Sequence, residues 1–287
     1  NVGKLRNSGF EFDVNVKIIQ KKDWYWDVSI NGYTYANKML NLPDEDKEAG
    51  MPNGNQRIYE GKDIYRWEMR QYAGLDEKGN SLWYMDQDIT DSEGNVVGVE
   101  KVTTDKATEA TQYLLEKSAL PDFTGGLNTT LRWKSLDLTI MANFQFGGYG
   151  YDYDFSAFSS ANFPMNRLKD YADAWNPETG KGSAPIWNTN DSNINASSDR
   201  FLVSNTYFNL RNITLGYTLP ASWMSKIGIK SARIYFACDN VFFASKRKGY
   251  DPRTSMGGQG ATIALNSVDG TYYSPIRTTS VGLNINF

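Results

Sequence analysis

The sequence contains no histidine and a single cysteine, Cys238, among its 287 residues. These absences exclude an intrachain disulfide, a Cys/His zinc site, a histidine-dependent catalytic triad and a histidine general base. The 30 basic residues form no long run and are outnumbered by 33 acidic residues. Much of the usual enzyme repertoire is therefore missing, and the charge distribution indicates no nucleic-acid partner.

Long apolar runs are absent as well. No stretch approaches the ~18 to 20 apolar residues of a membrane-spanning helix, and the opening residues, NVGKLRNSGF, show no signal-peptide pattern. The mean hydropathy is −0.54, which is usual for a soluble protein. A membrane β-barrel needs only ~9 to 11 residues per strand, apolar at alternate positions, so hydropathy leaves a membrane location open.

Apolar and polar residues alternate in many segments of the chain. Aromatic residues make up 14% of it, and apolar residues occupy every second position of Gly9–Ile18, from Phe10 onward. The same pattern recurs in residues 24–33, 123–133, 136–146, 209–219, 231–240 and 278–287. It predicts about seven strands.

The predicted connections alternate strictly between short and long. Short links cover residues 20–23, 134–135 and 220–230, and long polar segments cover 36–121, 147–206 and 245–273. In an up-and-down antiparallel meander this places every long loop at one end of the strands and every short turn at the other.

Charged and aromatic residues are also placed unevenly. In the middle of the strands, no charged residue occupies a position of the apolar phase. Arg211 and Arg277 do fall in that phase, but near the long-loop ends. Aromatic girdles are predicted at the two ends, with Trp24, Trp26, Trp133, Tyr217 and Phe287 beside the short turns and Phe144 and Phe146 beside the long loops. This pattern fits a lipid-facing barrel wall, because charge at mid-bilayer is costly. A soluble β-sandwich with one buried face explains the alternation equally well.

Seven stretches in order resemble the C-terminal part of the SusC/RagA family of TonB-dependent outer-membrane transporters, from about Leu5 to Phe287. They are YAGLDEKGNSLWY, ALPDFTGGLNTTLRWKSLDLTIMANFQFGGYGYD, AWNPETG, FNLRNITLGYTLP, SARIYFACDNVF, KGYDP and YSPIRTTSVGLNINF.

The resemblance implies an all-β fold, a transmembrane antiparallel up-and-down β-barrel with long extracellular loops. Residues 1–287 would supply about seven C-terminal strands of a barrel of about 22, and the plug domain would lie on sequence outside this chain. The implied function is TonB-energised import of large nutrients across the outer membrane of a Gram-negative bacterium, with a SusD-like lipoprotein as a lid. It implies no enzyme activity, no cofactor and no metal.

The last residues resemble the signal that the barrel assembly machinery reads on unfolded outer-membrane proteins. Phe287, Ile285 and Leu283 alternate on one face of the terminal strand. We expect them to act in assembly and to face outer-membrane lipid.

The long loops contain the candidate substrate-binding residues, namely Trp83, Tyr84, Tyr151, Tyr153 and Asp154. Aromatic rings flanked by acids suit stacking on sugars, so a glycan is favoured over a peptide. The alternatives are that residues 146–155 are simply an aromatic strand end and that loop Trp and Tyr side chains anchor the lid.

Other loop segments allow more than one interpretation. The acidic run Asp44–Glu48 fits no calcium-loop template. Lys246, Arg247 and Lys248 could meet lipopolysaccharide phosphates or be a solvated charge run. Residues 106–118 and 164–175 are predicted to form short helices. For the whole chain, a passive porin, a surface adhesin and a soluble carbohydrate-binding sandwich remain alternative functions.

Overall fold

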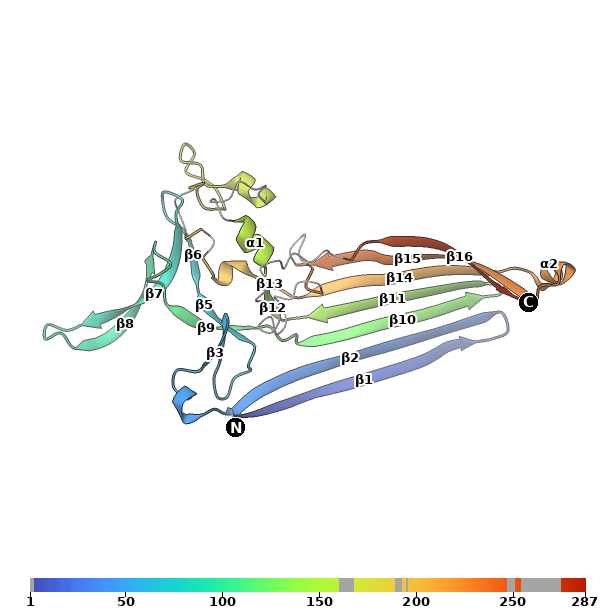
Figure 1. The fold of residues 1–287 in the computed structure, drawn as a ribbon, viewed down its shortest axis with the longest axis horizontal. Helices are drawn as coiled ribbons and strands as arrows, with labels where there is room; N and C mark the ends of the chain where they lie inside the picture. The colour runs from blue at the N-terminus through green and yellow to red at the C-terminus, as the bar shows by residue number, and fades with distance from the viewer. Residues whose placement is uncertain (1–2, 160–167, 189–192, 195, 247–250, 254–274) are drawn as a thin grey trace.

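The computed structural model describes residues 3–159, 168–188, 193–194, 196–246, 251–253 and 275–287, and most of them lie in antiparallel strands. The largest sheet has seven strands. In sheet order they are β1 (Lys4–Gln20), β2 (Trp24–Asn41), β10 (Phe123–Trp133), β11 (Leu136–Phe146), β14 (Tyr207–Thr218), β15 (Ser231–Ser245) and β16 (Thr278–Asn286). Long connections leave one end of this sheet and short turns close the other (Figure 1).

The predicted strands are confirmed, but several are longer than the alternation indicated. β2 continues to Asn41, so the first long connection begins there and not at Ala36. The cause is pairing: β1 and β2 stay in register as far as Arg6 with Lys38 and Asn7 with Asn37. In this outer part polar side chains occupy both faces, so period-2 alternation gives no signal.

The register places the apolar positions of neighbouring strands side by side. Leu127 of β10 pairs with Ile30 of β2 and with Ala142 of β11, whereas Asn128 pairs with Ser29 and Met141. We call the side of the sheet that carries Ile30 the apolar face and the opposite side the polar face. The apolar face is exposed over much of its area, at Phe10, Val14, Val16, Ile30, Leu215, Ile234, Phe236, Val281 and Leu283.

Aromatic rings lie at both ends of the apolar face, as predicted. Trp24 and Trp133 stack at the short-turn end, with ring centroids 5.7 Å apart. At the long-loop end Phe123 stacks with Phe144 at 6.0 Å. These rings lie over Gly32 and Gly125, where a Cβ would overlap them. The belt at this end therefore depends on glycine in the neighbouring strands.

Arg211 departs from the predicted phase. A register shift between Leu210 and Asn212 interrupts both pairings of β14, so strict alternation ends at this residue. Arg211 consequently lines a hollow with Asn31, Tyr33 and Asn143 of the polar face. The prediction that it lies in the apolar phase was wrong, because a β-bulge adds one residue to the strand and resets the faces.

The loop domain, formed by the described residues of 42–121 and 147–206, contains smaller sheets. One has the order β3 (Met51–Asn53), β4 (Gln56–Ile58), β5 (Arg66–Arg70), β9 (Gln112–Ser118). A second sheet has the order β6 (Tyr72–Leu75), β7 (Ser81–Thr90), β8 (Val96–Thr104). A third consists of β12 (Tyr149–Tyr151) and β13 (Leu202–Ser204). Its largest core cluster consists of Trp67, Met69, Leu115, Ala119, Tyr151 and Phe201.

The predicted helix at residues 106–118 is a strand over its second half. β9 pairs with β5, with Tyr113 opposite Met69, and places Leu115 in the core beside Trp67. Burial of alternate residues against β5 outweighs the helix propensity of this segment. The other predicted helix is a 3₁₀ helix in its described part, η2 (Lys169–Asp173), and residues 164–167 lie outside the described residues.

The remaining helical elements are short. They are α1 (Tyr153–Phe158), α2 (Ala221–Met224), η1 (Asp44–Asp46), η3 (Asp199–Phe201) and η4 (Ser225–Ile227). Across the described ranges, no helix is long and apolar enough to cross a membrane. The acidic run forms η1, where the Lys47 ammonium lies 2.6 Å from the Asp44 carboxylate.

Two turns of the loop domain share the same hydrogen-bond pattern and glycine conformation. Segments 76–80 (DEKGN) and 91–95 (DSEGN) join β6 to β7 and β7 to β8. In each, the aspartate Oδ1 accepts hydrogen bonds from two backbone N–H groups, at 2.8 Å in the first turn and 2.9 Å in the second. Gly79 and Gly94 have φ of 83° and 85°, which L side chains rarely adopt.

Candidate functional site

The polar face of the seven-stranded sheet is lined with amides, hydroxyls and a few charges. At its centre a hollow of about 320 Å³ is bordered by Asn31, Tyr33, Asn128, Asn143 and Arg211. These residues come from β2, β10, β11 and the bulge of β14. The side chains are suited to hydrogen bonding with a polar solute.

Toward the loop end this lining is held by a chain of hydrogen bonds. The Asn209 amide donates to Asn143 Oδ1 at 2.8 Å, and the Asn143 amide donates to the Tyr207 hydroxyl at 3.1 Å. Among the described residues, the Oδ1 atoms of Asn128 and Asn209 are buried and accept no hydrogen bond from protein. Buried acceptors normally accept at least one hydrogen bond, so water or a bound solute would donate to these two atoms.

A short segment after β15 closes over this network. Arg253 donates two hydrogen bonds to Asp251, at 2.9 Å and 2.6 Å, and Asp251 is buried. The Arg253 guanidinium lies 4.3 Å from the centre of the Phe243 ring and 6.0 Å from that of Tyr207. The bidentate pair fixes the guanidinium plane over the aromatic rings of β14 and β15.

Two charged contacts lie at the short-turn end of the polar face. Arg233 of β15 donates to Asp137 of β11 through Nε at 2.9 Å and through Nη2. Arg132 of β10 lies over the Tyr25 ring, 5.2 Å from its centroid. The polar face thus carries charged groups at this end, as well as the amides and Arg211 in the middle.

A larger hollow of about 1040 Å³ lies where the sheet meets the loop domain. Its charged lining residues are Lys38, Lys62, Asp63, Arg66, Glu116 and Asp122. Arg66 is held between Asp63, at 3.2 Å, and Glu116, at 2.6 Å. Most of the lining is polar, so this hollow between the loops and the strand ends is suited to contain water.

Two of the predicted substrate-binding residues are buried in the loop domain. Trp83 is 1% exposed and packs edge-on against Tyr72, while Tyr151 is 3% exposed in the core cluster with Phe201. A ring must present an open face to stack on a sugar. As they lie here, these two side chains stabilise the loop domain and offer no stacking surface.

The other predicted residues are more accessible. Tyr153 is 43% exposed at the start of α1, with Asp154 next to it, and its ring lies 4.7 Å from that of Tyr151. Tyr84 is half-buried, because the Lys101 ammonium lies 4.4 Å from its ring centre. The predicted set therefore divides between β7 and the β12–α1 segment.

Lys101 also approaches a second ring, 4.4 Å from the centre of Tyr113. The Tyr113 hydroxyl donates to Asp86 at 2.6 Å. Burial, followed by this hydrogen bond, raises the pKa of Tyr113 to about 12. The Tyr84 ring is thus part of a structural contact between β7, β8 and β9.

Sequence reasoning missed the residues of the polar face. Asn31, Asn128 and Asn143 belong to no motif and were only the polar members of alternating strands. The available signal for these three was the register: once Leu127 is placed beside Ile30 and Ala142, they must share the opposite face. Asn209 lies in the apolar phase of its strand, and only the bulge at Arg211 brings it opposite Asn143.

No protein-family model matches the chain. Among curated proteins it is 27% identical over 306 residues to the TonB-dependent receptor P3 of Formosa agariphila and 26% identical over 294 residues to the TonB-dependent receptor SusC of Bacteroides thetaiotaomicron. Each alignment covers 100% of this chain, and 29% and 27% of the respective relative.

Solved structures give the same result. The structure of the RagAB peptide transporter matches with a TM-score of 0.77 and 27% identity, over 100% of this chain and 30% of that one. The 'open-open' state of the RagAB peptide importer matches with a TM-score of 0.74 and 25% identity. The resemblance to SusC/RagA-type TonB-dependent receptors is therefore confirmed in sequence and in fold. The chain spans about 30% of the length of these relatives, which are named as receptors and transporters and not as enzymes.

Proposed function

We propose that residues 1–287 form a C-terminal section of the barrel wall of an outer-membrane importer for large nutrients, powered through TonB. The plug and the TonB-contacting segment would lie elsewhere in the whole protein. The observation that carries the proposal is the two-faced seven-stranded sheet, combined with similarity to TonB-dependent receptors along the whole chain.

The apolar face supports a position in the outer membrane. Its exposed side chains include Val281 at 76% and Phe236 at 47%, on neighbouring strands. Such a surface would be costly in water and is favourable against lipid, where burial of apolar area contributes ~25 cal/mol per Å². The polar face, with its asparagines and ion pairs, would then face the lumen.

A glycan is our first candidate for the imported solute. Tyr153 and Trp187 expose rings at 43% and 48% on the loop domain, and asparagine amides line the lumen side of the sheet. Rings and amides together suit sugar faces and hydroxyls. Because Trp83 and Tyr151 are buried, we assign the stacking role to Tyr153, which lies next to Asp154. Tyr84 is a secondary candidate, because Lys101 lies over its ring.

A peptide is the second candidate, because the RagAB proteins are described as a peptide transporter. Asparagine amides pair with a peptide backbone as readily as with sugar hydroxyls. Uptake competition between the two classes of oligomer separates the candidates.

The loop domain also offers a surface for a SusD-like lipoprotein lid. The hairpin of β7 and β8 exposes Ile89, Val96, Val97 and Val99, with Val97 at 64%. β8 is the outer strand of its sheet, so one of its edges carries no strand among the described residues. An apolar surface beside an open strand edge is typical of a protein-binding site.

The end of β16 supports the proposed role in assembly. Leu283 and Ile285 lie on the apolar face in register with Ile234 and Ala232, and Phe287 is exposed beyond them. We propose that the barrel assembly machinery reads this alternating segment before the strand is paired.

The proposal is tested by uptake in cells that produce the full-length protein and its lid. Fluorescent oligosaccharides and oligopeptides are supplied with and without a protonophore, and in a strain lacking TonB. Saturable uptake that ends when the proton gradient or TonB is removed is the expected result, with the lid co-purifying. Uptake that persists in both conditions would instead indicate a passive pore.

A further inference from the structure

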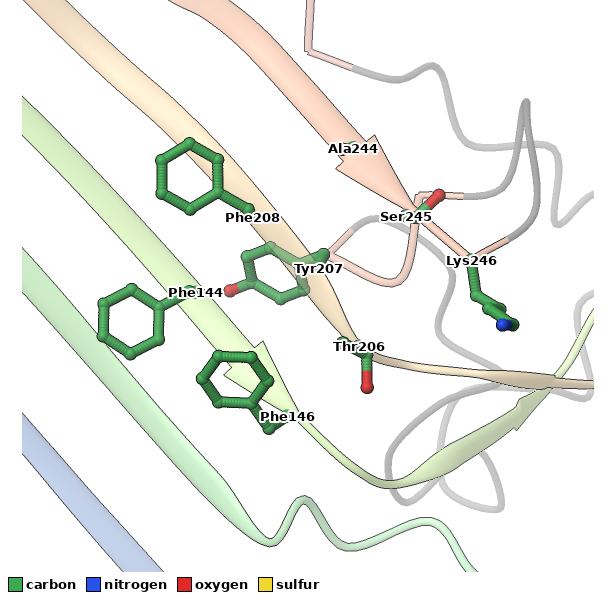
Figure 2. Close-up of a pocket in the computed structure, with 8 residues that line it drawn as sticks. All are labelled: Phe144, Phe146, Thr206, Tyr207, Phe208, Ala244, Ser245 and Lys246. Carbon is green, nitrogen blue, oxygen red and sulfur yellow. The ribbon is translucent and has the colours of Figure 1, made fainter.

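A second hollow, of about 470 Å³, lies on the apolar face at the long-loop end of β11, β14 and β15. Its lining includes Phe144, Phe146 and Phe208, the hydroxyl residues Thr206 and Ser245, and Lys246. Figure 2 shows the phenylalanine rings on neighbouring strands and Lys246 just past the end of β15. The hollow is on the opposite side of the sheet from the polar lining described above.

The floor of this hollow is aromatic and open. Phe144 pairs with Phe208 across β11 and β14, and the Phe144 and Phe146 ring centroids are 5.6 Å apart. Phe146 is 52% exposed and Phe208 43%. An exposed aromatic surface of this kind suits contact with a hydrocarbon chain.

The edge of the hollow is polar and carries a positive charge. Thr206 and Ser245 contribute hydroxyls, and the exposed Lys246 contributes an ammonium. Lys246 is the described member of the basic run noted in the sequence, and Arg247 and Lys248 lie outside the described residues. A cation at one end of an aromatic hollow matches a ligand with an anionic head and an apolar tail.

We propose that this hollow binds a membrane lipid whose phosphate-bearing headgroup has a net negative charge. The acyl chain lies against Phe144, Phe146 and Phe208, and the phosphate meets Lys246 where the strands end. A purely polar solute would leave the rings uncovered, and a neutral apolar one would leave the ammonium unused. The inference depends on the apolar face being lipid-facing but not on transport.

The test uses native mass spectrometry of the full-length protein released from detergent with added lipid. Phosphatidylglycerol and phosphatidylcholine of the same chain length are the probes. The expected result is tighter binding of the anionic lipid, and a loss of about fivefold of that preference in Lys246→Gln, since one basic residue near a membrane surface contributes about that factor. Phe208→Ala should weaken both lipids.

Matched controls lie on the same protein. Lys226→Gln changes an exposed lysine at the short-turn end, and Phe242→Ala removes an exposed ring that does not line the hollow. Neither should change the headgroup preference. An unchanged preference in Lys246→Gln, or full displacement of the anionic lipid by inorganic phosphate, would overturn the proposal, as would a co-purifying protein that Phe208→Ala releases.

Uptake is measured on the same variants. A lost lipid preference with normal uptake supports the lipid site, and an absence of uptake in the unaltered protein bears on the import proposal alone.

Discussion

Arg233 reaches across an intervening strand to Asp137. The arginine lies on β15 and the aspartate on β11, and β14 passes between them with Gly216 directly opposite Asp137. A Cβ at Gly216 would overlap the Arg233 guanidinium. A side chain at this position would have to displace the guanidinium. The ion pair ties three strands together on the polar face.

We predict that Gly216→Ala destabilises the protein about as much as Asp137→Asn, because both disrupt the same bidentate pair. The expected loss is about 1 to 3 kcal/mol. It is measured as the drop in the temperature at which the folded form is lost in semi-native electrophoresis. Gly98→Ala is the matched control, since a Cβ there meets only Ile89, at 3.7 Å. Additive effects in the double variant would contradict a shared interaction.

The buried and exposed aromatics of the loop domain should behave differently. Trp83→Ala removes a buried ring and is expected to destabilise the loop domain by about 3 to 5 kcal/mol, detected as faster proteolysis of residues 42–121. Tyr153→Ala should leave proteolysis unchanged and weaken oligosaccharide binding. Weakened binding in Trp83→Ala with normal proteolysis would show that Trp83 contacts the solute directly.

Low pH should increase the mobility of the turn between β7 and β8. Hydrogen bonds from Asn95 to the carboxylate, first from its backbone N–H and then from its side chain, lower the pKa of Asp91. The folded pKa lies below the ordinary value of 3.8, so the stabilisation is complete above that value and is lost as the pH falls through the folded pKa. A nitroxide attached at Ser92→Cys, in a Cys238→Ser background, should report increased mobility only below pH 3.8.

The same label gives the control for this turn. In Asp91→Ala it should be mobile throughout the pH range, because the acceptor is missing. A spectrum that is identical at pH 7 in the two proteins would show that the carboxylate does not organise the turn.

Phe287→Ala should lower the amount of full-length protein assembled in the outer membrane. Uptake per assembled molecule should stay the same, because Phe287 is exposed beyond the short-turn end of β16, in the phase of the apolar face. The measurement is the folded fraction in isolated outer membranes, with Phe10→Ala as an exposed aromatic control at the other end. Equal assembly of all three proteins would argue against a signal at Phe287.

The strands and their two faces could be predicted from the sequence because alternate burial leaves a period-2 pattern. Local irregularities could not: the bulge at Arg211 changes the phase without any glycine or proline to mark it, and β9 exists because Leu115 is buried against β5. The loop aromatics look alike in sequence, and only packing separates Trp83 from Tyr153. Sequence reasoning did not single out the repeated DEKGN and DSEGN turns, although an aspartate acceptor followed by a glycine is a typical signal of a tight turn.

The central claim is that the polar face borders water and the apolar face borders lipid. Ile30 and Asn31 are consecutive residues of β2, both exposed and on opposite faces. We would replace each by cysteine in the full-length protein, in a Cys238→Ser background, and label outer membranes with a water-soluble, membrane-impermeant maleimide. Fast labelling at Asn31→Cys with little at Ile30→Cys is the predicted result. Equal labelling at both positions would contradict the barrel-wall assignment.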